Sequence, residues 1–202
     1  MSSLTVTLSG RVVTLTPLSL DDVPGLVTAA SGDRSTFEWT DVPDDVEGMS
    51  GVVGDLLADQ ASRSAVAFVT RRRESGEIVG MTRFLNLRWW FAREHPDAVE
   101  IGGTFLSATA QRSSINTEAK LLMLHHAFDV WGVQRLDLKT DERNARSRHA
   151  IDRLGARSDG VLRNWQPSQV RGEEGRTRSS AMYSILPEEW PAVRDRLEQR
   201  LV

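Results

Sequence analysis

The chain has 202 residues, of which 40% are hydrophobic, and its formal net charge is −3. That charge gives no general reason to expect nucleic acid or an anionic membrane as partner, and a chain without cysteine cannot form disulfides or use a thiolate nucleophile. No stretch approaches the ~18 apolar residues of a membrane span, and the first thirty residues hold no signal-peptide core. We therefore expect a soluble, cytoplasmic, globular protein with no nucleic-acid partner, no membrane partner and no metal.

The first part of the chain alternates strand and helix signals. Residues 4–19 are rich in β-branched side chains and predict one or two strands. Ser19 is a suitable N-cap for a following helix, because Asp21 and Asp22 then lie in the first turn, where negative charge suits the helix dipole. A second helix is predicted over residues 44–60, where apolar residues have helical spacing, although three glycines weaken that prediction.

The remaining elements follow in an order typical of a mixed fold. Residues 71–77 form a predicted hairpin turn between two strands. Gly155 is expected to stop a short helix, since glycine is common just beyond helix ends. The predicted strands cover residues 64–70, 78–90, 99–107, 135–141, 161–166 and 179–186, and the predicted helices cover 115–131, 144–154 and 187–201. This order favours an α+β or mixed α/β sheet in one domain, residues 1–202.

Residues 109–128, TAQRSSINTEAKLLMLHHAF, join a polar segment to an apolar helix. The helix is apolar over so much of its circumference that we expect it inside the protein, against a sheet. One face carries Ile115, Ala119, Leu122, Met123, His126, Ala127 and Val130, and another carries Leu121, Leu124 and Phe128. The first turn of a helix leaves about four backbone N–H groups without partners, which with the dipole make an anion site. The alternative is an ordinary capped helix, since this loop lacks the glycines of most phosphate loops.

Four segments together resemble one known family. They are EIGGTFL, INTEAKLLMLHHAFDVWGVQRLDLKTDERNARSRHAIDRLGA, GVLR and YSILPEEWPAVRDRL, about half of the chain in the right order. The sequence resembles the GNAT (GCN5-related) N-acyltransferases, in particular the branch with the ribosomal-protein N-terminal acetyltransferases. The resemblance implies a mostly antiparallel mixed sheet with one splayed parallel strand pair and flanking helices. It also implies acyl-CoA, acetyl-CoA by default, as co-substrate.

The resemblance further implies where coenzyme A binds. The family holds the pyrophosphate on backbone amides of an Arg/Gln-x-x-Gly-x-Gly/Ala loop, where this chain has QRSSIN. The pantetheine would lie between the strands at 99–107 and 135–141, where the pair Gly102 and Gly103 suits either close backbone approach or a bulge. The implied coenzyme-binding residues are Phe105, Leu106, Gln111, Arg112, Ser113, Ser114, Ile115, Asn116, Thr117, Asn144 and Ser147.

Candidates for proton transfer to the leaving thiolate lie on the following helix. Much of the family has a tyrosine seven residues after an asparagine, but from Asn144 that position is Ile151, which cannot donate a proton. The branch that this chain resembles has serine three residues after the asparagine, which is Ser147. Asn144 would bind the pantetheine or a water, and Ser147 would face the thiol. The alternative is that Asn144 only caps the helix and Ser147 is solvated.

The amine also needs a base and the tetrahedral intermediate needs a donor. Glu100 is the leading base, because it opens the splayed strand and could act through water. Glu118 and Asp141 are weaker candidates, and Glu118 is better explained by the helix dipole. A backbone N–H near Phe105 or Leu106 would bind the oxyanion.

Some other polar and aromatic residues have structural explanations. His125 and His126 are adjacent, point in different directions and are interpreted as structural. Trp89 and Trp90 favour packing in a core or interface over a substrate wall. A basic patch follows residue 142 and consists of Arg143, Arg146 and Arg148. It could meet the coenzyme's 3′-phosphate or an acidic acceptor, or it could be a solvated helix surface without a functional role.

The main hypothesis is a CoA-dependent N-acyltransferase that transfers directly, without a covalent enzyme intermediate. The acceptor would be a protein N-terminus, a lysine or a small amine, and a longer or charged acyl chain could replace acetyl. A homodimer or higher homo-oligomer is expected from the resemblance. The alternative is a non-catalytic module that binds acyl-CoA or a nucleotide.

Overall fold

The computed structural model describes residues 4–91 and 94–201. Its strands are β1 (Leu8–Ser9), β2 (Val13–Pro17), β3 (Val66–Arg72), β4 (Ile78–Arg88), β5 (Ala98–Leu106), β6 (Arg135–Asp141), β7 (Arg157–Pro167) and β8 (Thr177–Ile185). Its α-helices are α1 (Val23–Ala30), α2 (Val46–Ala61), α3 (Ser114–His125), α4 (Ala145–Leu154) and α5 (Trp190–Gln199). Within these residues, no helix combines the length and apolarity that crossing a bilayer requires.

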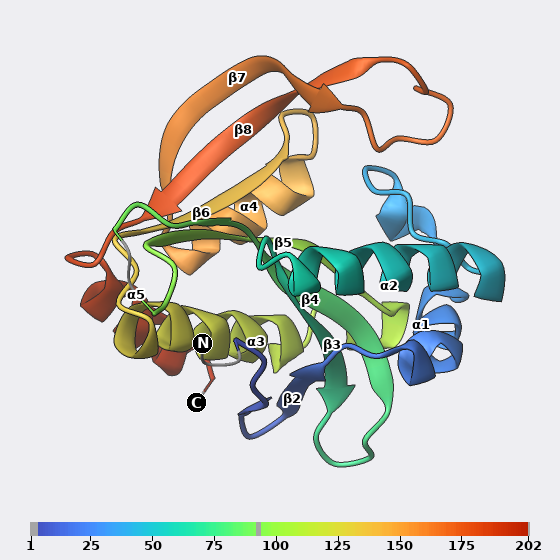
Figure 1. Cartoon of the computed structure of the whole chain (residues 1–202), viewed down its shortest axis with the longest axis horizontal. Coiled ribbons are helices and arrows are strands. Elements are labelled where there is room, and N and C mark those ends of the chain that lie inside the picture. The colour runs from blue at the N-terminus through green and yellow to red at the C-terminus, as the bar shows by residue number, and fades with distance from the viewer. Residues whose placement is uncertain (1–3, 92–93, 202) are drawn as a thin grey trace.

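The strands form one eight-stranded sheet in the order β1-β2-β3-β4-β5-β6-β8-β7 (Figure 1). All neighbouring strands are antiparallel except β5 and β6. The parallel pairing covers only three positions, from Ala98 opposite Arg135 to Glu100 opposite Asp137. This confirms the predicted α+β fold with a splayed parallel pair.

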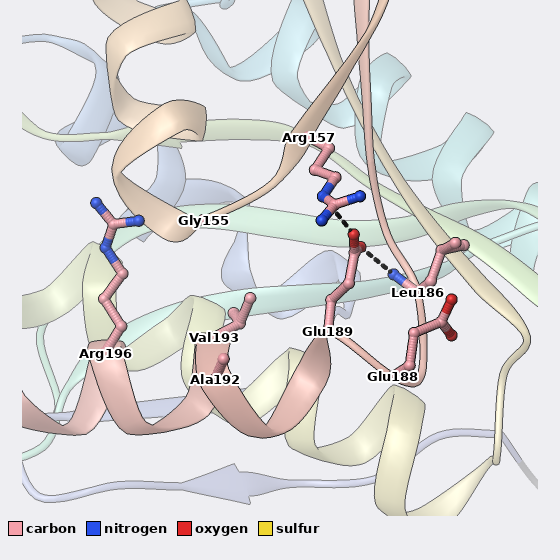
Figure 2. A pocket seen from close by; sticks show the side chains of 8 residues that line it. All are labelled: Gly155, Arg157, Leu186, Glu188, Glu189, Ala192, Val193 and Arg196. Carbon is pink, nitrogen blue, oxygen red and sulfur yellow. Dashed lines mark hydrogen bonds and ion pairs between the residues drawn. The ribbon is translucent and has the colours of Figure 1, made fainter.

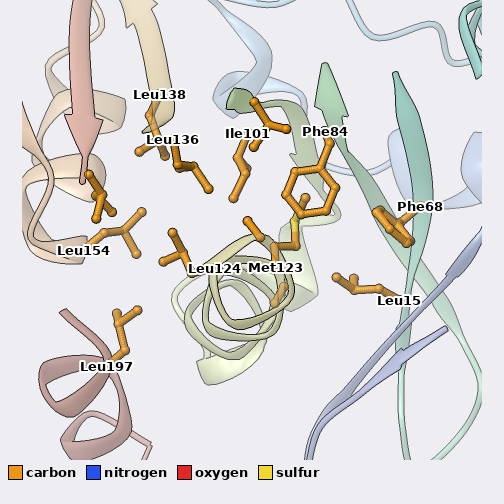
Figure 3. Close-up of a cluster of buried hydrophobic side chains, with 14 of the residues drawn as sticks. Leu15, Phe68, Phe84, Ile101, Met123, Leu124, Leu136, Leu138, Leu154 and Leu197 are labelled. Atoms are coloured by element: carbon orange, nitrogen blue, oxygen red, sulfur yellow. The ribbon is translucent and has the colours of Figure 1, made fainter. Parts of the chain in front are cut away.

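Helices cover both faces of the sheet. On one face, α3, α4 and α5 pack on strand side chains in the larger apolar core, and Figure 3 shows Met123 and Leu124 of α3 directed at them. On the other face, α1 and α2 pack on Ala67, Val69 and Phe105. The helix α3 is apolar over most of its circumference because it lies between the sheet and α5.

The predicted single helix over 115–131 is wrong in its last turn. After α3 the chain continues as a π-helical turn, His126–Val130, in which the N–H of Trp131 donates to the carbonyl of His126. The wider turn changes the side-chain register, so Val130, predicted on the buried face, is 52% exposed. His126 keeps its predicted structural role, because its ring packs on Trp131 with centroids 4.6 Å apart.

The predicted helix with three glycines exists as α2. Asp45 caps it, its Oδ1 accepting from the N–H of Gly48 at 2.8 Å. Gly51 and Gly54 lie on its exposed side, where no side chain is needed for packing. The last two strands are longer than predicted: β7 and β8 form a curved hairpin that extends well beyond the α4 side of the sheet (Figure 1).

Candidate active site

The splayed strands leave a V-shaped gap in the sheet. Beyond Glu100 and Asp137, β5 stays paired with β4 and β6 stays paired with β8, but the two no longer pair with each other. The inner edges of Ile101–Leu106 and Leu138–Asp141 therefore have no strand partner in the part of the chain that the structure describes. Free edges of this kind bind extended groups through backbone hydrogen bonds.

A β-bulge shapes the β5 side of the gap. Met81 opposes Phe105 and Arg83 opposes Gly102, so the single residue between them, Thr82, faces two residues on β5. Gly103 has φ +56°, in the left-handed region that glycine adopts without strain. Of the two interpretations of the glycine pair, the structure therefore shows the bulge.

The segment between β5 and α3 turns sharply without a glycine. Arg112 has φ +55°, the conformation that glycine usually supplies in phosphate loops. Ser113 follows as the N-cap of α3: its hydroxyl donates to the carbonyl of Ala110 at 2.6 Å and accepts from the N–H of Ile115 at 3.3 Å. Ser113 therefore caps the start of α3, as one of the two interpretations of this segment predicted. The remaining first-turn amides point out of the helix end.

Gln111 fixes this segment to the end of β5. Its Nε2 donates to the carbonyl of Leu106 at 2.9 Å and to the hydroxyl of Thr36 at 2.7 Å. Thr36 belongs to the loop between α1 and α2, and its carbonyl also accepts from Arg146. The α1–α2 loop, the start of α3 and the start of α4 thus meet beside the open end of the gap.

Asn144 and Ser147 lie at the start of α4. Asn144 is the N-cap, and its Oδ1 accepts from the N–H of Ser147 at 2.9 Å. The side-chain oxygen of Asn144 therefore caps the helix, which is the alternative role that the sequence suggested for this residue. Ser147 is half-buried, and its hydroxyl bonds to no residue in 4–91 or 94–201. Ile151 is buried in the core, as an apolar residue in the place of a tyrosine should be.

Glu100 lies at the point where the strands part. It is 4% exposed, and its Oε2 accepts from Asn86 Nδ2 at 2.8 Å and from Lys139 Nζ at 2.9 Å. Neither partner follows from the sequence, because each contact depends on the register between β5 and a neighbouring strand, β4 for Asn86 and β6 for Lys139. Its Oε1 accepts no hydrogen bond from the described residues and lies on the Gly102 side.

The two weaker base candidates are bound elsewhere. Glu118 accepts the backbone N–H groups of Arg11, Val12 and Val13 at 2.7–2.9 Å, so it attaches the β1–β2 turn to α3. Asp141 accepts from the backbone N–H, Nε and Nη2 of Arg143, which hold its pKa below the usual value despite the opposing effect of burial. Neither carboxylate is free to take a proton from an amine.

The basic patch after residue 142 has structural partners. Arg143 pairs with Asp141 and Glu173 and stacks over Trp39, 4.8 Å from its ring centre. Arg148 donates to the hydroxyl of Tyr183 at 3.2 Å. These contacts join α4 to the α1–α2 loop and to the β7–β8 hairpin.

The predicted oxyanion donors and the tryptophan pair occupy different surroundings. Phe105 and Leu106 belong to the free-edged part of β5, and the Phe105 ring meets Phe37 of the α1–α2 loop edge-on at 5.9 Å. Trp89 and Trp90 are 37% and 52% exposed, so they are not core residues.

A hollow of about 470 Å³ lies away from the gap, where α4 ends against α5. Figure 2 shows Glu189 at its wall, bound to Arg157 at 2.7 Å and to the N–H of Leu186 at 2.9 Å. Because Glu189 is already bound to Arg157 and to the backbone of Leu186, we assign this hollow to the packing of α5 against the start of β7.

Comparison with known proteins agrees with this geometry. Residues 13–157 match the family described as the acetyltransferase (GNAT) domain. A protein from T. thermophilus, provisionally assigned as an acetyltransferase, is 31% identical with a TM-score of 0.81, and all of both chains is covered. A GCN5-related N-acetyltransferase from Brucella melitensis has a TM-score of 0.83 at 24% identity, over 98% of this chain and 86% of that one. None of the curated proteins compared matches this chain.

RimJ from Mycobacterium smegmatis, solved with CoA-disulfide, has a TM-score of 0.79 at 21% identity, over 98% of this chain and 96% of that one. At this identity the similarity concerns the fold alone. Together, the splayed sheet and the family match define a protein of the acyltransferase class. The chain belongs to the GNAT acetyltransferase family, which confirms the predicted resemblance.

Proposed function

We propose that the protein transfers an acyl group, acetyl by default, from acyl-CoA directly to a primary amine. The observation that carries this proposal is the end of β5–β6 pairing at Glu100 and Asp137, which leaves two free edges next to the start of α3. A pantetheine arm has amides that pair with such edges, and a diphosphate suits the first-turn amides that α3 leaves without helical partners.

The proposed roles follow the geometry of the gap. Amides of Gln111 to Thr117 hold the diphosphate, and a backbone N–H near Phe105 or Leu106 binds the oxyanion. Asn144, while capping α4, has its amide nitrogen left to bind the pantetheine or a water. Ser147 faces the thiol, either to give it a proton or to hold it in position.

Direct transfer of the acyl group from sulfur to nitrogen needs no covalent enzyme intermediate. The amine nitrogen bonds to the thioester carbon, and the bond from carbon to sulfur then breaks. The amine proton passes to Oε1 of Glu100, directly or through water, while Oε2 stays bound to Lys139 and Asn86. The thiolate, whose thiol has a pKa of about 8.5, leaves with or without a proton from Ser147.

Release of free thiol tests the proposal. The protein is incubated with acetyl-CoA and a panel of acceptors: peptides with free N-termini, lysine side chains, amino sugars and polyamines. Thiol release that requires both protein and amine supports transfer and ranks the acceptors. Tight acyl-CoA binding without release on any acceptor supports the alternative, a non-catalytic acyl-CoA-binding module.

We also propose a homo-oligomer, in which exposed aromatic residues at the end of β4 meet a second copy. Trp90 and Phe91 are 52% and 61% exposed. Sedimentation of the wild type and of a Trp90→Ser variant checks this: a change toward the monomer is expected, and a monomeric wild type contradicts it.

A further inference from the structure

One face of the sheet carries charged side chains beside the V-shaped gap. Along a strand, side chains alternate between the two faces. Val99 and Ile101 pack in the core on the α3 side, so Glu100 points to the opposite face, which α1 and α2 cover in part. The same alternation along β6 and β8, where Leu138 and Ala181 face the α3 side, places Lys139, Asp141, Arg178 and Ser180 on that face. We call this set the polar floor: Arg83, Glu100, Lys139, Asp141, Arg178 and Ser180.

Both acids of the polar floor already have cationic partners. Glu100 pairs with Lys139 at 2.9 Å, and Asp141 pairs with Arg143 at 2.8 Å. Each acid is more than nine-tenths buried. Their negative charge is therefore balanced without the other two cations of the floor.

Those two cations, Arg83 and Arg178, have no hydrogen-bond or ion-pair partner among the described residues. Arg178 is 8% exposed, and its Nε is buried without a hydrogen bond. Arg83 Nε is buried without a hydrogen bond as well. Neither guanidinium forms a hydrogen bond or ion pair with any residue in 4–91 or 94–201. The hydroxyl of Ser180, next to Arg178 on the same face, is also buried and unsatisfied. A buried guanidinium nitrogen without a hydrogen-bond partner is costly, so two of them beside a buried, unsatisfied hydroxyl indicate a missing anion.

Arg83 lies at the bulge of β5. It shares a face with Met81, which packs beside α1 and α2, and its Nε would be 2.7 Å from a Cβ on Gly103. The Arg83 side chain therefore lies over the bulge, two residues before Phe105, one of the two proposed oxyanion donors. Burial lowers the pKa of both Arg83 and Arg178; the charge of Asp59 opposes this most at Arg83 and that of Asp141 at Arg178, and Glu100 opposes it less in both.

A small pocket lies at the loop end of the β7–β8 hairpin. This pocket of about 280 Å³ opens between the α1–α2 loop, at Asp41, and the β7–β8 loop, at residues 168–171 and 174. Arg178 is the second residue of β8, directly after that loop.

We infer that Arg83 and Arg178 bind a carboxylate of the substrate, carried either by the acyl chain or by the amine acceptor. The inference rests on the proposed function and narrows its substrate class. Guanidinium groups bind carboxylates through paired N–H donors.

Two matched comparisons separate the two sources of the carboxylate. The first measures kcat/KM for succinyl-CoA against butyryl-CoA, which differ only in the end of a four-carbon chain. The second uses acetyl-CoA with peptides that begin with Asp or with Asn. We expect a preference of about tenfold or more for the acid in one comparison, which names the source. Calorimetry of the same ligand pairs gives the preference in Kd, independently of turnover.

Three variants connect the preference to the floor. Arg178→Gln and Arg83→Gln should each lower the preference for the acidic substrate at least about fivefold, and Arg178→Lys should retain part of that preference. Arg163→Gln, at an exposed site on β7, is the matched control and should leave it unchanged. Circular dichroism confirms that each variant is folded.

The outcomes distinguish the two proposals. Equal kcat/KM and Kd for acid and neutral partners in both comparisons overturn the carboxylate site, while turnover of acetyl-CoA leaves the proposed function intact. A preference that survives both arginine variants also overturns it. If no acyl-CoA is turned over, the proposed function fails, and the Kd comparison alone then decides whether the floor binds a carboxylate.

Discussion

Glu100 on β5 and Lys139 on β6 form an ion pair of 2.9 Å across the place where these strands separate. Their side chains are only 6% and 12% exposed. The pair therefore joins the two strands at the base of the V-shaped gap, where Asn86 adds a third contact. One oxygen of Glu100 is fixed by this network, and the other faces Gly102.

Glu100→Gln tests the proposed base with little change in volume. We expect kcat/KM to fall about 10²- to 10⁴-fold at neutral pH, because the amine proton loses its acceptor. Activity of the variant should recover as the pH approaches the pKa of the amine, where free amine becomes abundant. Steady-state rates of thiol release between about pH 7 and pH 10 measure this for wild type and variant. Parallel pH profiles with similar rates would exclude Glu100 as the base.

Arg112 gives a test of the loop that precedes α3. Its φ of +55° strains any residue with a Cβ, by about 1 kcal/mol. Arg112→Gly should therefore be more stable than Arg112→Ala by about that amount, although both lose the same charge. Chemical denaturation compares the free energies of unfolding. Both variants should bind CoA more weakly than wild type and equally with each other, and equal stabilities would show that the left-handed conformation is not strained.

Gly103 should be more sensitive than a glycine with similar backbone angles elsewhere. Gly76 has φ +73° with open space around it, so Gly76→Ala should cost about 1–3 kcal/mol in stability and leave kcat/KM unchanged. Gly103→Ala adds a contact of 2.7 Å with Arg83 Nε at the bulge. We expect its kcat/KM to fall about tenfold or more, since misplacing the strand misplaces the thioester. Equal activities of the two variants would contradict the role of the bulge.

Lys120 makes stability depend on pH. Its Nζ is buried beneath the bulge, donating to the hydroxyls of Thr82 at 3.0 Å and Thr104 at 2.8 Å, and burial lowers its pKa to about 7. An unfolded lysine titrates near about 10.4, so between these values the unfolded state holds the proton and the folded state does not. Below about pH 7 both states are protonated, and the folded protein bears the full cost of burying the charged lysine. The free energy of unfolding should therefore rise by up to about 4 kcal/mol as the pH goes from about 7 to 10.

Denaturation of a Lys120→Met variant over the same pH range isolates this effect. The variant should be more stable than wild type at neutral pH and should lack most of the rise. Lys120→Arg, which keeps its charge throughout, should be the least stable of the three. The same slope in wild type and Lys120→Met would assign the pH dependence to other groups.

The sequence alone predicted those helices and strands that a local pattern of apolar and polar residues defines. Alternation and hairpin turns located the strands, and the apolar circumference of α3 placed it against the sheet. The π-turn at His126–Val130 was missed, because it depends on the tertiary packing of Trp131 and His126, which the local pattern does not specify. The length of β7 was missed because its side chains are exposed on both faces and show no alternation.

The candidate site was predictable where it is built from contiguous residues. The turn at residues 111–117 and the position of Glu100 follow from motif and order. Lys139 was not predictable as a partner of Glu100, since its contact depends on the register of two parallel strands. Arg83 and Arg178 reach one floor only because a bulge and a distant hairpin bring β4 and β8 to the same gap.

A crystal structure with acetyl-CoA tests the central claim most directly. The account predicts the diphosphate within about 3.2 Å of backbone N–H groups at the start of α3, with the pantetheine between the inner edges of β5 and β6. Electron density for the coenzyme at any other place, or no binding at millimolar acetyl-CoA, would contradict it.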